Sequence, residues 1–133
     1  MLELFAIVVA GLLVFLSAAV QHLNTISTRG LSFVFTDRST PLAREGFAGR
    51  AARTLQNNLE SAGMFVPAAA IVSLGGHATA LSGLAATVYV AARLGFTASY
   101  WLGASRPRSF FWGLGMAAIA AMSALACLAI LAG

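Results

Sequence analysis

Charge is scarce in this 133-residue sequence. Only 9% of its residues are charged, whereas soluble domains carry roughly 25%, and 59% are hydrophobic, with a mean hydropathy of +0.87. Lysine is absent, and the net charge of +4 rests on arginines that are too thinly spread to form a nucleic-acid interface. The composition excludes an ordinary soluble domain and indicates a membrane protein.

Cysteine and histidine are also scarce, which limits the chemistry. The single Cys127 cannot form an intrachain disulfide, and its place in the apolar last segment predicts a small buried side chain. His22 and His77 are expected at opposite faces of the membrane, so no metal site is predicted. The sequence has no Ser-His-Asp arrangement, phosphate loop or dinucleotide fingerprint. Glu3, the lack of a basic N-terminal region and the lack of a small-residue cleavage site predict a retained helix rather than a signal peptide.

Four apolar segments are long enough to cross a bilayer core, which takes roughly 20 residues per helix. They cover about 4–28, 50–74, 77–101 and 109–131. The sequence therefore predicts an all-α membrane protein, a four-transmembrane-helix bundle that occupies residues 1–133 as a single domain. Only 32 residues separate Glu60 from Arg93. Because two spans need roughly 40, both charges are expected at or inside the membrane boundary, where ionisable groups usually serve function.

The positions of the arginines predict the orientation in the membrane. The first connection and its flanks hold Arg29, Arg38, Arg44, Arg50 and Arg53, the third connection holds Arg106 and Arg108, and the second holds none. The positive-inside rule then places the first and third connections in the cytoplasm and both termini in the periplasm, if the membrane is a bacterial inner membrane. The long first connection is either a functional lid or a solvated loop.

Polar side chains recur at helical spacing on three predicted helices. They are Ser17, Gln21, Asn24 and Thr28 on the first, Arg50, Arg53, Asn57 and Glu60 on the second, and Tyr89, Arg93, Phe96 and Tyr100 on the third. The first set either forms interhelical hydrogen bonds or lines a cavity.

Depth along the second and third helices follows from their distance to the turn at Gly75-Gly76. At about 1.5 Å per residue, Glu60 lies level with Arg93, and Arg53 lies level with Tyr100. We therefore predict a Glu60–Arg93 ion pair, which either fixes helix register alone or forms part of a site. The remaining arginines suit a small ligand with several negative groups.

Two blocks of the sequence carry a family resemblance. The first is the run Arg53-Thr54-Leu55-Gln56-Asn57-Asn58-Leu59-Glu60, followed by Phe65 and Pro67, and the second is Arg93, Tyr100 and Arg106-Pro107-Arg108-Ser109. With the four-helix layout, these blocks resemble the MAPEG superfamily, the membrane-associated proteins in eicosanoid and glutathione metabolism. The resemblance spans about residues 29–112.

The resemblance implies a homotrimer that binds glutathione as a cosubstrate in clefts between subunits, on the cytoplasmic side. The positions that match glutathione-binding residues are Arg29, Arg53, Gln56, Asn57, Glu60, Arg93 and Tyr100. Arg108 matches the arginine that holds the glutathione thiolate, with Arg106 as the alternative.

The implied activity is that of a glutathione-dependent transferase or peroxidase that acts on lipophilic electrophiles or hydroperoxides from the bilayer. The alternative is a non-catalytic lipid- or thiol-binding membrane protein of the same fold. A proton-coupled exporter is disfavoured, because the predicted first helix has no carboxylate near its middle.

Overall fold

The computed structural model describes residues 1–37, 41 and 45–132, and the regular elements among them are all helices. Four are long: α1 (Leu2–Arg29), α3 (Gly46–Leu74), α4 (Ala80–Leu102) and α5 (Ser105–Ala132). A short helix, α2 (Leu31–Val34), lies in the segment that we expected to be a loop. The bounds of these four helices lie within about four residues of the four apolar segments in the sequence.

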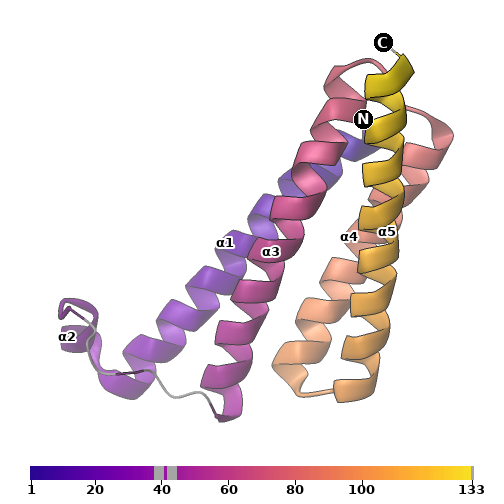
Figure 1. The fold of residues 1–133 in the computed structure, drawn as a ribbon. Coiled ribbons are helices and arrows are strands. Elements are labelled where there is room, and N and C mark those ends of the chain that lie inside the picture. Colours follow the sequence, from indigo (N-terminus) through magenta and orange to yellow (C-terminus); the bar gives the residue numbers. More distant parts are fainter. Residues whose placement is uncertain (38–40, 42–44, 133) are drawn as a thin grey trace.

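The long helices run up and down, so that the N-terminus and the end of α5 lie at one end of the molecule (Figure 1). The α4–α5 turn and the start of α3 lie at the other end, which we call the turn end. Capping residues set the bounds of α4. Thr79 and Ser82 exchange backbone and side-chain hydrogen bonds in a capping box, so α4 begins at Ala80 rather than near 77. Gly103, with a φ of 76°, ends α4 in the left-handed conformation that glycine adopts without strain.

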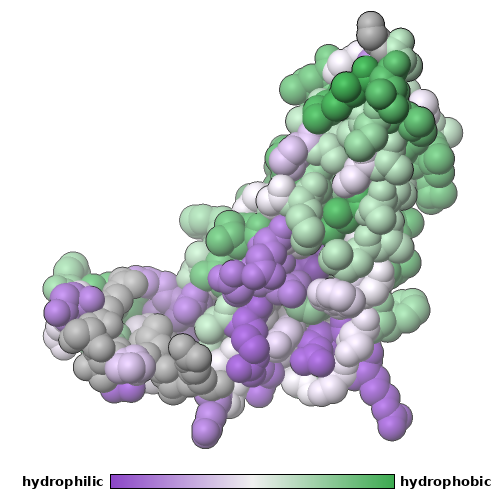
Figure 2. All heavy atoms as spheres, viewed as in Figure 1, coloured by the Kyte–Doolittle hydropathy of each residue, from purple (hydrophilic) through white to green (hydrophobic). Residues whose placement is uncertain are grey.

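The helices pack as two pairs, α1 with α3 and α4 with α5, which come apart toward the turn end (Figure 1). The apolar core lies between the pairs on the side of the termini. There Phe65 of α3 stacks on Tyr89 of α4 with ring centroids 3.7 Å apart, and Met122 of α5 is fully buried in the same cluster. Small alanines complete this core and allow the helices to approach closely. Hydrophilic residues gather at the turn end instead (Figure 2).

Three of the described helices, α1, α4 and α5, are long and apolar enough to cross a membrane. Large apolar side chains point outward, as with Phe15, which is 67% exposed, and Leu128, which is 62% exposed. Such an apolar exterior requires a membrane or a partner to cover it. Cys127 is exposed on the same helix as Leu128, so its predicted burial was wrong. An almost wholly apolar helix does not reveal from its sequence which side faces inward.

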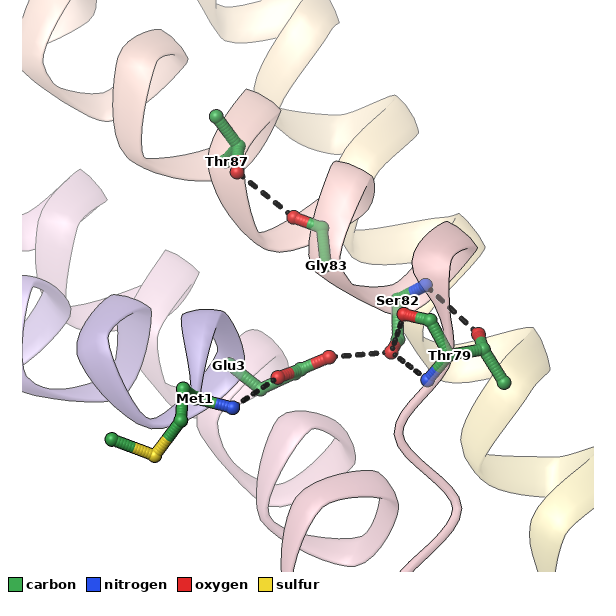
Figure 3. A network of polar contacts seen from close by, with 6 residues as sticks. All are labelled: Met1, Glu3, Thr79, Ser82, Gly83 and Thr87. Atoms are coloured by element: carbon green, nitrogen blue, oxygen red, sulfur yellow. Dashed lines mark hydrogen bonds and ion pairs between the residues drawn. The ribbon is translucent and has the colours of Figure 1, made fainter.

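A buried carboxylate joins α1 to the start of α4 (Figure 3). Glu3 is only 2% exposed. One of its oxygens accepts a hydrogen bond from Ser82 Oγ, and the other lies 3.2 Å from the Met1 ammonium. A carboxylate is favourably placed at the N-terminus of a helix, where backbone N–H groups point outward. This contact fixes the first turn of α1 at the end of the molecule opposite the turn end.

Candidate functional site

Three arginines converge at the turn end, where the first turns of α3 face the α4–α5 connection. Arg50 and Arg53 of α3 and Arg108 of α5 line a cavity of about 250 Å³, which we call the arginine cavity. Tyr100 and Ser105 line it as well, and none of its described lining residues is acidic. The arginine cavity is therefore suited to an anionic ligand, because guanidinium groups bind carboxylates through charge-assisted hydrogen bonds.

Tyr100 contacts two of these three arginines, Arg53 and Arg108. Arg53 Nε donates a hydrogen bond to the Tyr100 hydroxyl at 3.1 Å, which agrees with the predicted equal depth of the two residues. The Arg108 guanidinium carbon lies 5.1 Å from the centroid of the Tyr100 ring, within the range of a cation–π contact. The Phe96 ring meets the Tyr100 ring edge-on at 5.3 Å. Tyr100 thus holds two guanidinium groups at a common level.

A second cavity of about 300 Å³ adjoins the first, and we call it the aromatic cavity. It is lined by Asn57, Phe96, Tyr100, Arg108, Ser109 and Trp112. Tyr100 and Arg108 line both cavities, whereas the exposed Arg106 lines neither. Arg108 therefore lies at the boundary between a cationic space and a space walled by aromatic rings.

The predicted ion pair between Glu60 and Arg93 was wrong. Arg93 is 3% exposed, and its Nη2 donates to Asn57 Oδ1 at 3.1 Å and to Asn58 Oδ1. Glu60 is exposed and accepts a hydrogen bond from Gln56 Nε2 at 2.7 Å. The predicted depth of Glu60 and Arg93 along their helices was not the error, since Asn57, which Arg93 contacts, lies only one helical turn from Glu60. The rotation of α3 turns the Glu60 side chain away from Arg93 and turns Asn58 toward it.

Arg29 and the polar stripe of α1 lie on the other side of α3. Ser17 forms the interhelical hydrogen bond that was one of its two predicted roles, by accepting from Asn58 Nδ2 at 2.8 Å. Gln21, Asn24, Thr28 and Arg29 instead line a small cavity of about 100 Å³ against Ala48 and Ala52. A further surface cavity borders Arg53 and Gln56. Within one chain, Arg29, Gln56 and Glu60 are therefore not brought into the arginine cavity.

Comparison with known proteins agrees with this architecture. The sequence matches the family described as the MAPEG family over residues 2–128, which is nearly the whole chain. The chain belongs to the MAPEG family. No curated protein and no solved structure gave a match. Together with its three long apolar helices, MAPEG membership identifies an integral membrane protein.

Two residues of this MAPEG chain, Asn58 and Arg50, are absent from the glutathione-binding positions that the resemblance implied, although Arg50 belongs to the arginines that the sequence assigned to an anionic ligand. Asn58 lies inside the recognised run, yet it is off the polar stripe of α3. It is 3% exposed and hydrogen-bonds to Ser17, Thr97 and Arg93, so it joins α1, α3 and α4. Arg50 belongs to the stripe and lines the arginine cavity. A polar stripe identifies a wet face, but only packing shows which members reach a cavity.

The arginine cavity has the charge to position an anionic ligand and alter its ionisation. Its charged groups are guanidiniums, which donate hydrogen bonds and do not take up protons. The arginines that line the arginine cavity therefore cannot act as general bases. What the cavity does supply is positive potential, which favours the anionic form of any acid that binds beside Arg108.

Proposed function

We propose that this protein is a membrane-bound glutathione transferase or peroxidase that activates the glutathione thiol. One observation carries the proposal: Arg108 borders both the arginine cavity and the aromatic cavity. A ligand anchored by its carboxylates in the first cavity would hold its thiol near Arg108. The second cavity would then admit a lipophilic partner next to the sulfur. Membership of the MAPEG family, which is associated with glutathione in general, supports the proposal.

Glutathione offers two carboxylates, an ammonium, two peptide groups and a thiol. The carboxylates suit Arg53 and Arg50, which can each donate two hydrogen bonds to one carboxylate. The ammonium suits Glu60 and Gln56, both of which carry acceptor oxygens. Tyr100 and Asn57 supply neutral polar groups between these charges. The residue types thus match the ligand group by group.

Arg108 is the proposed catalytic residue, because a nearby guanidinium stabilises thiolate over thiol. A thiol with a pKa near 8.5 is only about 3% ionised at pH 7, and lowering that pKa by one unit raises the thiolate population nearly tenfold. In the transferase reaction, the thiolate sulfur forms a bond to an electrophilic carbon while the leaving group departs with the bonding electrons. In the peroxidase reaction, two glutathione molecules are oxidised to the disulfide, and the hydroperoxide is reduced to an alcohol and water.

The complete site is proposed to form in a homotrimer. Arg29, Gln56 and Glu60 belong to the matching glutathione-binding positions, yet in one chain they lie outside the arginine cavity. If a neighbouring copy packs against the face of α3 that carries Gln56 and Glu60, then these two residues and Arg29 would lie beside the arginine cavity of that copy. Native mass spectrometry should detect three copies with bound glutathione, and a protein found solely as single copies would contradict this assembly.

The proposed topology treats residues 1–133 as a single four-helix transmembrane domain. In this topology α3 also crosses the membrane, in addition to α1, α4 and α5. Its first turns, which carry arginines, lie at the cytoplasmic boundary. The termini then lie in the periplasm of a bacterial inner membrane, and the site opens toward the cytoplasm, where glutathione is present. The lipophilic substrate enters from the bilayer.

The decisive experiment is a measurement of thiolate formation. Adding glutathione at pH 7 to the detergent-solubilised protein should raise the ultraviolet absorbance of the thiolate and release about half a proton per occupied site. The rival function is non-catalytic binding of a lipid or thiol by the same fold. Binding of glutathione without thiolate absorbance would favour that rival and would rule out the enzyme.

A further inference from the structure

The Arg93 guanidinium is buried at the centre of the bundle without an acidic partner. It is 3% exposed, and the part of the chain that the structure describes gives it no ion pair. Burying a charge in this way is costly unless its donors are satisfied. Two amide oxygens satisfy Nη2, and the Phe96 ring lies 4.4 Å from the guanidinium carbon. Since Arg93 is absent from the described lining of both cavities, its effect on a ligand must pass through these neighbours.

The contact with Asn57 decides which way that amide points. A guanidinium group has only hydrogen-bond donors, so the group facing it must be the amide oxygen and not the NH2. Asn57 Oδ1 accepts from Arg93 at 3.1 Å, which leaves Nδ2 as the other polar end of a half-buried side chain that lines the aromatic cavity. Without Arg93, nothing in the described contacts of Asn57 would prevent the amide from turning over and presenting its oxygen.

We propose that Arg93 is a positioning residue that orients Asn57 so that its NH2 group donates to an acceptor oxygen of the ligand. This role rests on the proposed function, in which the ligand is glutathione and the acceptor is a peptide carbonyl. Arg93 also stacks on Phe96, a second lining residue of the same cavity. The buried charge therefore fixes the wall of the site without touching the ligand, and the site selects ligands that accept a hydrogen bond at this point.

A double-mutant cycle on the full-length, detergent-solubilised protein tests this role, with glutathione binding measured by calorimetry. Arg93→Met and Asn57→Ala should each raise the Kd about tenfold, the effect expected for the loss of one well-placed hydrogen bond. In the Asn57→Ala background, Arg93→Met should change the Kd less than about twofold, because the amide that Arg93 orients is gone. If the double variant raises the Kd by the product of the two single effects, the proposal is overturned.

Asn57→Asp provides a second test that does not depend on removing the buried charge. The carboxylate can pair with Arg93, so the variant should unfold at the same temperature as the parent or higher. Its second oxygen would face the ligand where an NH2 group is needed, so the Kd should rise more than about tenfold. An Asn57→Asp protein that binds glutathione as tightly as the parent would overturn the proposal.

Ser17→Ala is the matched control for damage to the buried network. It removes the hydrogen bond from Asn58 Nδ2 to Ser17 Oγ in the same core but leaves the contact between Arg93 and Asn57 intact. We expect a lower unfolding temperature and an unchanged Kd. If Ser17→Ala weakens binding as much as Arg93→Met does, Arg93 has a structural role only. If the parent protein binds no glutathione, the proposed function itself is refuted. If the parent binds glutathione but the Kd effects of Arg93→Met and Asn57→Ala multiply, only the role of Arg93 is refuted.

Discussion

Replacing Arg108 with alanine should separate thiolate formation from glutathione binding. If the guanidinium were roughly 4 Å from the sulfur of bound glutathione, the two unit charges would interact by about 4 kcal/mol at an effective dielectric constant of about 20. Arg108 is only half-buried, so solvent screens this interaction, and we expect about half of it. A gain of about 2 kcal/mol corresponds to a thiol pKa lowered by about 1.5 units. The bound thiol would then be roughly half ionised at pH 7, compared with about 3% in Arg108→Ala.

A pH titration of thiolate absorbance measures this shift directly. The bound thiol has a lowered pKa in the parent, so its thiolate is present at neutral pH and is lost as the pH falls below about 7. In Arg108→Ala the titration should move up by about 1.5 units, so that raising the pH restores the absorbance. Arg106→Ala is the matched control, since Arg106 is exposed and lines neither cavity, and its titration should coincide with that of the parent. Equal titration curves for Arg108→Ala and the parent would refute the assigned role.

Three further substitutions test other parts of the structure. Arg53→Ala should weaken glutathione binding by about 1.5 to 3 kcal/mol, the worth of one charge-assisted hydrogen bond, and unchanged affinity in calorimetry would remove Arg53 from the site. Asn58→Ala should destabilise the protein by about 1 to 3 kcal/mol, because it removes the partner of Ser17 on α1 and of Thr97 on α4 and one of the two acceptors of Arg93, and a thermal melt equal to that of the parent would contradict this. Gly103→Ala places a Cβ at a φ of 76° and should cost about 1 to 2 kcal/mol in chemical unfolding; an unaltered unfolding midpoint would show that the turn relaxes.

Glu60 and Arg53 show that helical spacing predicts the depth of a polar residue but not the neighbour that it faces. Both residues were assigned a depth by counting from the same glycine turn. Arg53 meets Tyr100 as that count predicts, with 3.1 Å between Nε and the hydroxyl, whereas Glu60 hydrogen-bonds to Gln56 on its own helix. Residues at one depth can face different neighbours, because each successive position on a helix is rotated by about 100°.

Residue order and hydropathy alone determined the helical class of this protein, the positions of its long helices and the concentration of arginine at one end. These features are local, because each follows from the number of apolar residues in a row and from where charges interrupt them. The motif around Arg53 to Glu60 also identified the family correctly.

Only the tertiary structure decided which side chains share a cavity. The rotation of each helix about its axis and the divergence of the two helix pairs depend on the packing of many small residues from all four long helices. No local sequence pattern predicts this combined packing. Packing turned Asn58 and Arg93 into the bundle, left Glu60 outside, and placed Arg108 between the arginine cavity and the aromatic cavity.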